Sequence, residues 1–575
     1  MMRQMKRWAA GLLAAGMALS LCACGPRERA EPAPSPAPSA APTQSPSPAP
    51  EESGLAICLG GEPATLDPTL VRRRVDVSIL SHLFEGLMRW APSDETDDGL
   101  ARAQLTYGQA QSYDRVENAD GTVTYTFHLR PDAKWSDGKA VTAHDFVYAW
   151  QRLVTPATGA YYADMIDCVV NAAEVSSGAK EPSELAVWAV DDATFAVTVH
   201  DVPWFLQLCA FPAAFPVRQD MVDKNPDQWS YSLDTLVTNG MYRLSAWDHG
   251  AQLVLEPSEQ YDAAAAGTAP ALTFAFSADD SAILSAYQAG NLDFAVCAPA
   301  GQVPELMDKG DMDDADYVGT YYLTFQTRKA PFDDARVRKA FTLAVDRERL
   351  VEEVTASGES PADGYVPSGI SDADGPTGDD FREEGGDYYD VDADDYKDNC
   401  DQARDLLAQA GYPGGAGFPA VEYLYNTGER HKAVAQALQE MWQKELGVTV
   451  TLVDQEWSVF LQTRREGGYS IARGSWTADY DDPMSFLELW RTGATGNDAQ
   501  YADADYDRLL TDAAAAPNAK ERMMLLHQAE NLLIGRDYAL CPLYFYTKPY
   551  LLRDGVEGVC YTPLGYFFFH DATKK

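Results

Sequence analysis

A proline-rich stretch near the start separates this chain of 575 residues into a part that cannot fold by itself and a part that can. Residues 26–54 are mostly Pro, Ala, Ser and Glu, with almost no branched or aromatic side chains. Such a stretch buries too little apolar surface to offset the entropy lost on folding, so it predicts a tether with a reach of roughly 90 Å at about 3.1 Å per residue. A mixed body begins at Leu55, and its length predicts two or three packed lobes instead of one core.

The residues before the tether have the pattern of an export signal. Basic residues at 3, 6 and 7 precede an apolar run at 8–21, which is too short to span a bilayer with ease. The run ends in Leu21-Cys22-Ala23-Cys24, which resembles the lipobox of bacterial lipoproteins. This resemblance implies a signal at 1–23, a lipid on Cys24, and anchoring at the outer face of the bacterial cytoplasmic membrane or in the periplasm. An ordinary secretory signal with another cleavage site is the alternative.

The charge of the chain excludes two classes of partner. Asp and Glu number 87 against 45 Lys and Arg, which gives a net charge of −42. Nucleic acid and anionic lipid headgroups are repelled by such a surface. The acidic residues are densest between Asp372 and Asp405, where a solvated surface is expected.

Motifs for catalysis, metals and cofactors are missing from the sequence. There is no Gly-x-Ser-x-Gly, His-Glu-x-x-His or phosphate-binding loop. Asp390-Val-Asp392-Ala-Asp394 imitates the opening of a calcium loop, but Asp395 stands where the turn needs glycine. The nine cysteines have no Cys-x-x-Cys spacing. Without Cys22 of the signal and Cys24, seven remain, of which at least one is unpaired and most are expected to be buried. The sequence therefore predicts a protein that is not an enzyme and holds no metal or cofactor.

Local periodicity predicts an α/β body. Residues 122–130 alternate as a half-buried strand, and 143–153 carry apolar residues at helical spacing. The Gly-, Pro- and Asp-rich stretch 356–399 predicts a long surface excursion. Further helices are predicted at 336–354, 400–410, 431–446 and 520–534.

The aromatic content, 12 Trp, 30 Tyr and 21 Phe, exceeds what core filling needs, so some of these rings are expected to line a ligand cavity. Within Arg473–Pro483 a guanidinium, the Trp476 indole and the Asp479 carboxylate lie close together in sequence. A charge of each sign beside an aromatic wall suits a zwitterionic ligand. A surface ion pair beside a core tryptophan fits the same residues equally well.

A set of ordered motifs runs from about residue 55 to the C-terminus. The longest is the stretch Tyr125–Arg152, with Trp135-Ser-Asp-Gly138 inside it. The others are Glu62–Pro68, Phe84–Leu87, Asn239–Tyr242, Pro331–Arg338 with Asp346-Arg347, and Trp476–Pro483. Taken together, this set resembles the extracellular solute-binding proteins of family 5, the peptide-binding receptors of ABC importers.

The resemblance implies the two-lobed fold of periplasmic binding proteins (a Venus flytrap) with an additional third domain, in which mixed sheets are flanked by helices. The lobes close over an extended peptide by a hinge motion. Matching segments assign 1–23 to the signal and 24–54 to the lipidated cysteine and tether. They assign 55–84, 222–318 and 548–575 to lobe I, 85–221 to the extra domain, and 319–547 to lobe II.

Segments such as Asn426–His431 and Ala472–Trp476 are most similar to the oligopeptide-binding branch of the family. The resemblance implies that Asp479 pairs with the α-ammonium of the ligand. It also implies that Arg473, Arg464 and His431 engage ligand carboxylates or side chains, and that Asn426, Trp476, Tyr162 and Tyr546 line the pocket. An aromatic residue here could instead be plain core, and Arg464 could be solvated.

The chain departs from that branch at several positions. Arg72 falls where the branch often has an acidic residue, and Cys297 lies near a usual asparagine. Gly319 and Thr477 replace a cysteine pair, so that disulfide is excluded. An arginine in the cleft leads to the hypothesis of a preference for acidic peptides.

The function implied is capture of oligopeptides and their delivery to the permease subunits of an ABC importer, by a monomer held at the membrane only through its lipid. Peptide main chain is common to every ligand, so affinity without sequence specificity is expected. The alternatives are a non-peptide ligand (a metal chelate, haem, an oligosaccharide) or a surface chaperone or adhesin.

Overall fold

A computed structural model describes residues 54–575 apart from 98–99, 227, 262–269, 297 and 376–377. The signal, Cys24 and nearly all of the tether lie outside these described residues, and what was predicted for them stays a prediction. Within the described part, no helix is both long and apolar enough to cross a membrane.

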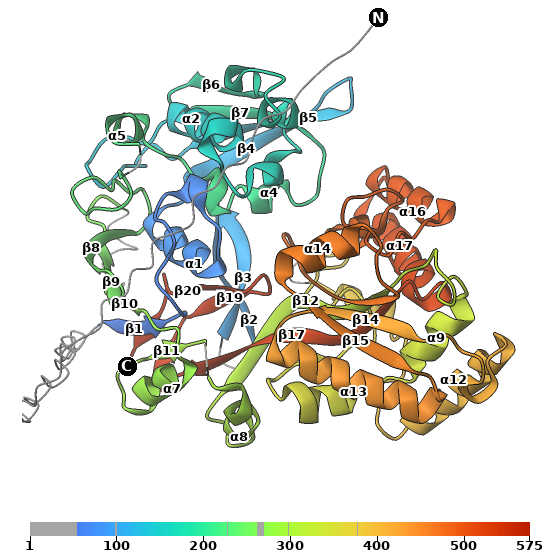
Figure 1. Ribbon diagram of the computed structural model, residues 1–575. Coiled ribbons are helices and arrows are strands. Elements are labelled where there is room, and N and C mark those ends of the chain that lie inside the picture. The colour runs from blue at the N-terminus through green and yellow to red at the C-terminus, as the bar shows by residue number, and fades with distance from the viewer. Residues whose placement is uncertain (1–53, 98–99, 227, 262–269, 297, 376–377) are drawn as a thin grey trace, which may run out of the picture. The chain divides into compact units, whose positions relative to one another are not determined.

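Among the described residues, eleven strands form one continuous sheet (Figure 1). β1 (Leu55–Cys58) is buried along its whole length and pairs in parallel with a strand on each side, which explains its unbroken apolar sequence. In spatial order the strands are β15 (Val450–Gln455), β14 (Val421–Asn426), β16 (Ile471–Thr477), β12 (Asp313–Phe325), β17 (Leu540–Leu552), β11 (Phe294–Ala295), β1, β10 (Leu272–Ala275), β9 (Gln252–Pro257) and β8 (Tyr242–Asp248), and β13 (Ser360–Pro361) pairs with β17.

Two long antiparallel strands, β12 and β17, join the two ends of this sheet and lie side by side in Figure 1. Their ladder changes register between Asp316 and Thr320, and such an irregularity bends a strand pair. The predicted boundary 318/319 falls within this irregularity, and the boundary 547/548 lies directly beside it. The division of the chain stays a prediction, and we keep the names lobe I, extra domain and lobe II for the ranges given above.

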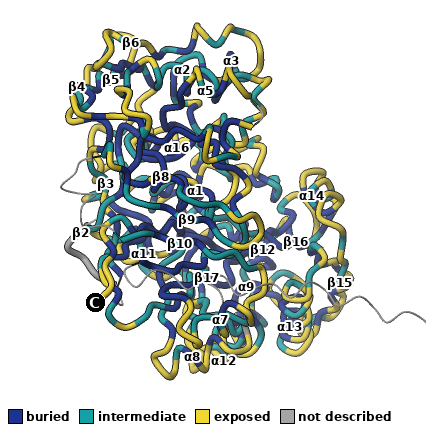
Figure 2. The backbone as a smooth tube through the Cα atoms, turned by 90° about the vertical axis from the view of Figure 1, so that its left-hand side faces the viewer, coloured by how far each residue is buried: buried dark blue, intermediate teal, exposed yellow. Residues whose placement is uncertain are grey.

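The extra domain contains a sheet with the order β4 (Ala110–Glu117), β5 (Thr122–Leu129), β7 (Thr194–His200) and β6 (Val187–Asp191). Buried and partly buried side chains alternate along β5, which confirms the strand predicted at 122–130. α2 (Ala143–Val154) confirms the helix predicted at 143–153 and contributes a buried face that includes Phe146 and Trp150. Figure 2 shows the edge strands β4 and β6 largely exposed, whereas β17 is mostly buried, and β9 and β10 contain only buried and partly buried residues.

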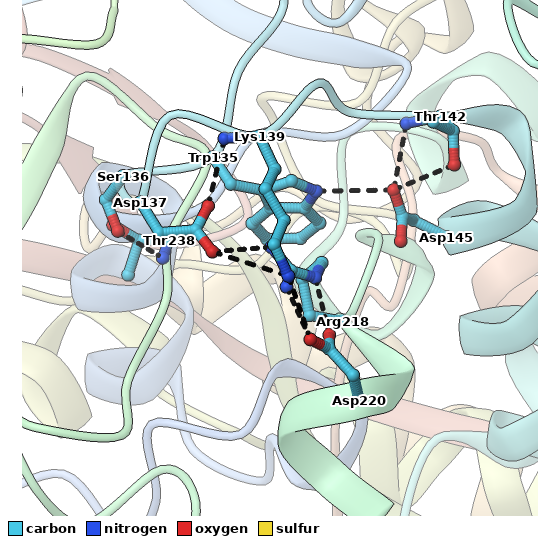
Figure 3. Close-up of polar contacts among 9 residues, drawn as sticks. All are labelled: Trp135, Ser136, Asp137, Lys139, Thr142, Asp145, Arg218, Asp220 and Thr238. Atoms are coloured by element: carbon cyan, nitrogen blue, oxygen red, sulfur yellow. Dashed lines mark hydrogen bonds and ion pairs between the residues drawn. The ribbon is translucent and has the colours of Figure 1, made fainter.

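The Trp135-Ser-Asp-Gly138 motif forms a polar network next to α2 (Figure 3). The buried Trp135 indole donates to the Asp145 carboxylate (3.2 Å), which also accepts from the main-chain N–H of Thr142 (2.8 Å). Asp137 accepts from Arg218 (3.0 Å), whose guanidinium forms two further hydrogen bonds with Asp220 (2.7 Å each). The network joins the loop before α2 to the start of α5 (Gln219–Lys224).

The C-terminal segment returns to lobe I and packs on α1 (Arg74–Leu83). The main-chain N–H of Phe569 donates to His82 Nε2 (2.9 Å), and that of Phe567 donates to Ser78 Oγ (3.2 Å). Its strands belong to two small sheets, made of β2 (Met88–Asp97), β3 (Leu100–Tyr107), β19 (Cys560–Thr562) and β20 (Tyr566–Phe568), and of β18 (Val556–Glu557) and β21 (Thr573–Lys574).

Most predicted helices of lobe II are confirmed with shifted ends. The helix predicted at 400–410 is α12 (Tyr396–Gln409), and the one at 431–446 is α13 (Glu429–Leu446). The helix predicted at 520–534 is α17 (Ala519–Glu530), which continues as a π-helix to Arg536. Elsewhere in the described residues, the α-helices are α3 (Ala172–Ser176), α4 (Phe205–Leu208), α7 (Asp280–Gln288), α8 (Val303–Asp308), α9 (Ala335–Leu343), α10 (Arg347–Arg349), α11 (Phe381–Gly385), α14 (Trp457–Arg465), α15 (Met484–Leu487) and α16 (Ala504–Ala514).

The single helix predicted at 336–354 is wrong, because the chain breaks between α9 and α10. The Asp346 side chain accepts from the main-chain N–H of Arg349 (3.0 Å) and starts a new helix there. The buried Arg347 guanidinium donates to the carbonyl oxygens of Thr342 and Pro542, which gives the end of α9 a partner from β17.

The surface excursion predicted at 356–399 is also wrong in part. Tyr365 and Phe381 have no exposed surface. The Arg382 guanidinium is buried and pairs with the buried Glu530 carboxylate of α17 (2.7 Å). A buried ion pair formed with a distant segment holds this stretch in lobe II.

The apolar cores lie against the sheets. In lobe II, for example, Phe341 and Trp442 belong to one core together with buried residues of β12 and β14. Six cysteines lie in the described part, and five of them are buried, as predicted for most; Cys168 is partly buried, and all six are free. No group of three or more His, Cys, Asp or Glu residues able to hold a metal ion is found in the described ranges, including 390–395.

Candidate ligand-binding site

A cavity of about 960 Å³ collects residues from distant stretches of the chain. They come from the start of α1, from 161–168 and Trp204 in the extra domain, and from β16 with the loop that follows it. The lining consists of Arg72, Arg73, Arg74, Tyr161, Tyr162, Asp164, Met165, Asp167, Cys168, Trp204, Ser475, Trp476, Thr477, Asp479 and Tyr480. Four predicted site residues, Arg72, Tyr162, Trp476 and Asp479, are thus brought together in a volume typical of ligand sites.

Asp479 stands in the loop after β16 with its side chain exposed to the cavity. Its main-chain N–H donates to Ser485 Oγ (3.1 Å), and its carboxylate has no hydrogen bond or ion pair with the described residues. Loss of water around the Asp479 carboxylate, through burial, raises its pKa to about 6. The charge of Arg74 opposes this rise, and the charge of Asp164 adds to it. A cation from outside would stabilise the ionised carboxylate.

Three consecutive arginines enter the cavity from lobe I and differ in their contacts. Arg73 donates to Asp76 (3.1 Å) and to the carbonyl of Glu62. Arg74 donates to Thr477 Oγ1 (2.9 Å) and to the carbonyl of Leu564. Arg72 is exposed and has no hydrogen bond or ion pair with the described residues. One guanidinium at this wall is therefore open to a ligand.

Aromatic rings form the walls on the side of the extra domain. Tyr162 packs edge-on against Tyr161 (ring centroids 4.8 Å apart) and Phe211 (5.0 Å), and burial raises its pKa to about 12. Trp204 stacks on Tyr480 with centroids 4.0 Å apart and an interplanar angle of 9°. These walls offer apolar surface with polar tips, which is the composition of many ligand pockets.

Three further predicted residues gather around Tyr321 on β12. The Arg473 guanidinium lies over the Tyr321 ring (5.2 Å to the centroid) and donates to Ser475 Oγ (3.1 Å). The Tyr321 hydroxyl hydrogen-bonds His431 Nδ1 (3.2 Å), and burial followed by the Arg473 charge lowers the pKa of His431 to about 4. Burial raises the pKa of Tyr546, and the charge of Arg473 opposes that rise. Ser475 lines the cavity, so this group adjoins it along β16.

Like the three residues around Tyr321, the last two predicted residues, Arg464 and Asn426, lie outside the cavity lining. Arg464 is buried, pairs with Asp498 (2.9 Å) and lies over the Phe460 ring (5.5 Å), so it is not solvated. Asn426 ends β14, and its side-chain Oδ1 is buried without a hydrogen bond in the described part of the chain. Gly319 and Thr477, which stand where the oligopeptide-binding branch has a cysteine pair, lie opposite each other in the ladder of β12 and β16.

Several lining residues were not predicted, among them Arg74, Tyr161, Asp164 and Trp204. One signal was present in the sequence: Arg72, Arg73 and Arg74 directly precede or begin α1, where the helix dipole disfavours cations. Three arginines at a helix start therefore indicate a role other than helix stability. Asp164 and Trp204 carry no comparable local signal.

An α/β body of two lobes and a third domain, with a large cavity lined from all three, is the architecture of a solute-binding protein. The model of the bacterial extracellular solute-binding proteins, family 5 Middle, matches residues 104–498. The chain is 32% identical over 577 residues to the dipeptide-binding protein DppE of Bacillus subtilis, with 100% of both chains covered. It is 34% identical to the periplasmic oligopeptide-binding protein OppA of Salmonella typhimurium, over 87% of this chain and 88% of that protein.

A solved structure shows the same fold. The unliganded open form of MppA, a periplasmic murein tripeptide-binding protein, superposes with a TM-score of 0.76 at 30% identity, over 92% of this chain and 98% of that one. The chain belongs to the bacterial extracellular solute-binding proteins of family 5. It is a binding protein and not an enzyme.

Proposed function

We propose that this protein binds oligopeptides in the 960 Å³ cavity, outside the cytoplasm, and delivers them as a monomer to the permease of an ABC importer. Relatives that are named for dipeptide and oligopeptide binding support this ligand class. The roomy, polar and aromatic lining suits ligands that share a backbone and differ in side chains.

The observation that carries the proposal is the unpartnered carboxylate of Asp479. It faces the cavity, its pKa is raised by burial, and it has no hydrogen bond or ion pair with the described residues. The α-ammonium of a peptide supplies the missing cation, and a sugar supplies none. Asp479 is therefore the proposed anchor for the ligand's amino terminus.

The other predicted residues take roles that follow from their surroundings. Arg473 and His431, which flank Tyr321 beside the cavity, receive a carboxylate or polar side chain of the ligand. Trp476, Tyr162 and Tyr546 supply apolar walls. Arg464 and Asn426 act on a longer ligand that extends past the cavity, since they belong neither to its lining nor to the group around Tyr321 that adjoins it.

Lipid anchoring at Cys24 is part of the proposal and has its own test. A tether and a lipid keep the receptor near its permease while leaving the body free to move. The wild-type protein should fractionate with membranes and take up labelled palmitate in its host. Cys24→Ala should do neither, and a variant that still carries label would contradict the assignment.

Native mass spectrometry of protein purified from its own host tests the ligand class. We expect a ladder of masses above the protein mass that tandem fragmentation resolves into peptides of differing sequence. Asp479→Ala, purified in parallel, should lose most of that ladder. A single discrete non-peptide mass, such as a metal chelate, haem or an oligosaccharide, would overturn the proposal.

A further inference from the structure

The loop that carries Asp479 is a wall between two cavities. Asp479 and Tyr480 line the proposed peptide cavity, whereas the next two residues, Asp481 and Asp482, line a second cavity of about 430 Å³. Trp204 of the extra domain lines both cavities. The position of the anchor carboxylate therefore depends on what holds this short loop from behind.

Lobe II holds the loop through its two following carboxylates. Asp481 accepts from the main-chain N–H (2.7 Å) and the hydroxyl (2.5 Å) of Ser371. Asp482 receives two hydrogen bonds from the Arg522 guanidinium, each 2.7 Å long. These contacts fix the end of the loop that is distant from the cavity.

The extra domain holds the same loop from the opposite side. The Gln207 side-chain amide donates to the carbonyl oxygen of Asp481 (3.3 Å) and accepts from the main-chain N–H of Asp481 (3.0 Å). Both main-chain groups of one loop residue are thus satisfied by one side chain. The ring of Trp204 stacks on Tyr480, the residue next to Asp479.

We propose that Gln207 and Trp204 are positioning residues for the Asp479 carboxylate, an inference that rests on the proposed binding of peptide amino termini. A short loop with two fixed main-chain hydrogen bonds and one stacked ring keeps its neighbouring carboxylate in place. Without Gln207, the loop samples other conformations, and the ammonium of the ligand meets the carboxylate in fewer of them.

Calorimetry with Ala-Ala-Ala and its N-acetylated form measures this role. The wild type should prefer the free peptide, because only that peptide carries an ammonium. Gln207→Ala should weaken binding of the free peptide about tenfold, since two hydrogen bonds are lost, and leave the acetylated peptide unchanged. Trp204→Ala should act in the same direction. Gln111→Ala, an exposed glutamine on β4 of the same domain, is the matched control and should bind as the wild type does.

A double variant separates positioning from general damage. If Gln207 acts through Asp479, Gln207→Ala combined with Asp479→Asn should bind the free peptide no more weakly than Asp479→Asn alone. Additive losses, or an unchanged preference for the free peptide in Gln207→Ala, would overturn the positioning role alone. Equal affinity of the wild type for both peptides would overturn the proposed anchor and this inference with it.

Discussion

The network around Trp135 and the cavity around Asp479 contain the same kinds of residue, tryptophan, aspartate and arginine. They differ in whether the charged side chains have partners within the protein. In the network, the Asp145 carboxylate and the Arg218 guanidinium each have several partners within the protein (Figure 3). In the cavity, the Asp479 carboxylate and the Arg72 guanidinium have no hydrogen bond or ion pair with the described residues. Polar groups that have hydrogen-bond partners within the protein stabilise the fold, whereas polar groups of a cavity that have none are available to a ligand.

The same contrast separates two of the family motifs, Glu62–Pro68 and Pro331–Arg338, from the motif Trp476–Pro483, which contains Asp479. Asp67 of the Leu-Asp-Pro motif forms two hydrogen bonds with Arg152 (2.9 and 2.6 Å). Arg338 of another motif is buried and donates to the carbonyls of Phe332 and Asp537 (2.7 and 2.8 Å). These motif side chains are occupied inside the structure. They therefore indicate the fold and say little about the ligand.

The largest effect is expected from breaking the network. Trp135→Ala removes a fully buried indole and its hydrogen bond to Asp145, so the free energy of unfolding should fall by about 3–5 kcal/mol. Urea unfolding followed by circular dichroism measures the loss. Trp188→Ala, on the exposed face of β6, is the matched control and should change stability by less than about 1 kcal/mol. Equal losses in both variants would contradict a structural role for the network.

Asp479→Asn should show the opposite pattern, with a loss of binding and no loss of stability. Stranding the ligand ammonium should cost about 2–5 kcal/mol of affinity for a peptide with a free amino terminus. Because the pKa of Asp479 is raised in the folded protein, its ionised form is disfavoured there at neutral pH, and the amide should leave the unfolding free energy equal or higher. Calorimetry and urea unfolding on the same preparations give both numbers. Reduced stability with unchanged affinity would contradict the assignment of Asp479 to ligand binding and would give it a structural role like that of the network.

The raised pKa also predicts a pH dependence of binding. Below about pH 6 the free carboxylate is protonated, and the ligand ammonium must displace that proton, so affinity should fall by up to about tenfold per pH unit. Titrations from pH 7.5 to 4.5 measure the slope. Asp363 has its pKa raised to about 6 by burial as well, so Asp479→Asn is the necessary control. A flat profile is expected for that variant, and a slope that persists in it would assign the titration to another group.

Local patterns predicted local structure, and the failures have distant causes. The strand at 122–130 and the helix at 143–153 follow from the periodicity of their own side chains. The break after α9 has a local cause, the Asp346 cap on Arg349, and a distant one, the contact of Arg347 with Pro542. The burial of Arg382 depends on Glu530, which is also far away in sequence. No window of the sequence shows such pairs.

The site residues also divide into those that a local motif predicted and those that it did not. The resemblance indicated Asp479 and Trp476, which lie in one continuous motif, and the structure places both in the cavity. Asp164 and Trp204 reach the same cavity from a domain whose sequence has no motif at those positions. Arg74 was detectable from the run of arginines at the start of α1, because cations are unfavourable there.

The smallest effect concerns the open guanidinium of Arg72. An exposed ion pair contributes about 0.2–1 kcal/mol, so the wild type should bind Ala-Glu-Ala about 1.4- to fivefold more tightly than Ala-Ala-Ala. Arg72→Gln should abolish this preference, and Arg72→Glu should reverse it in favour of Ala-Lys-Ala. Arg73→Gln is the matched control, because Arg73 lines the same cavity but already pairs with Asp76. A preference for the acidic peptide that survives in Arg72→Glu would contradict the role of Arg72 and assign the selectivity to one of the other two lining arginines, Arg73 or Arg74.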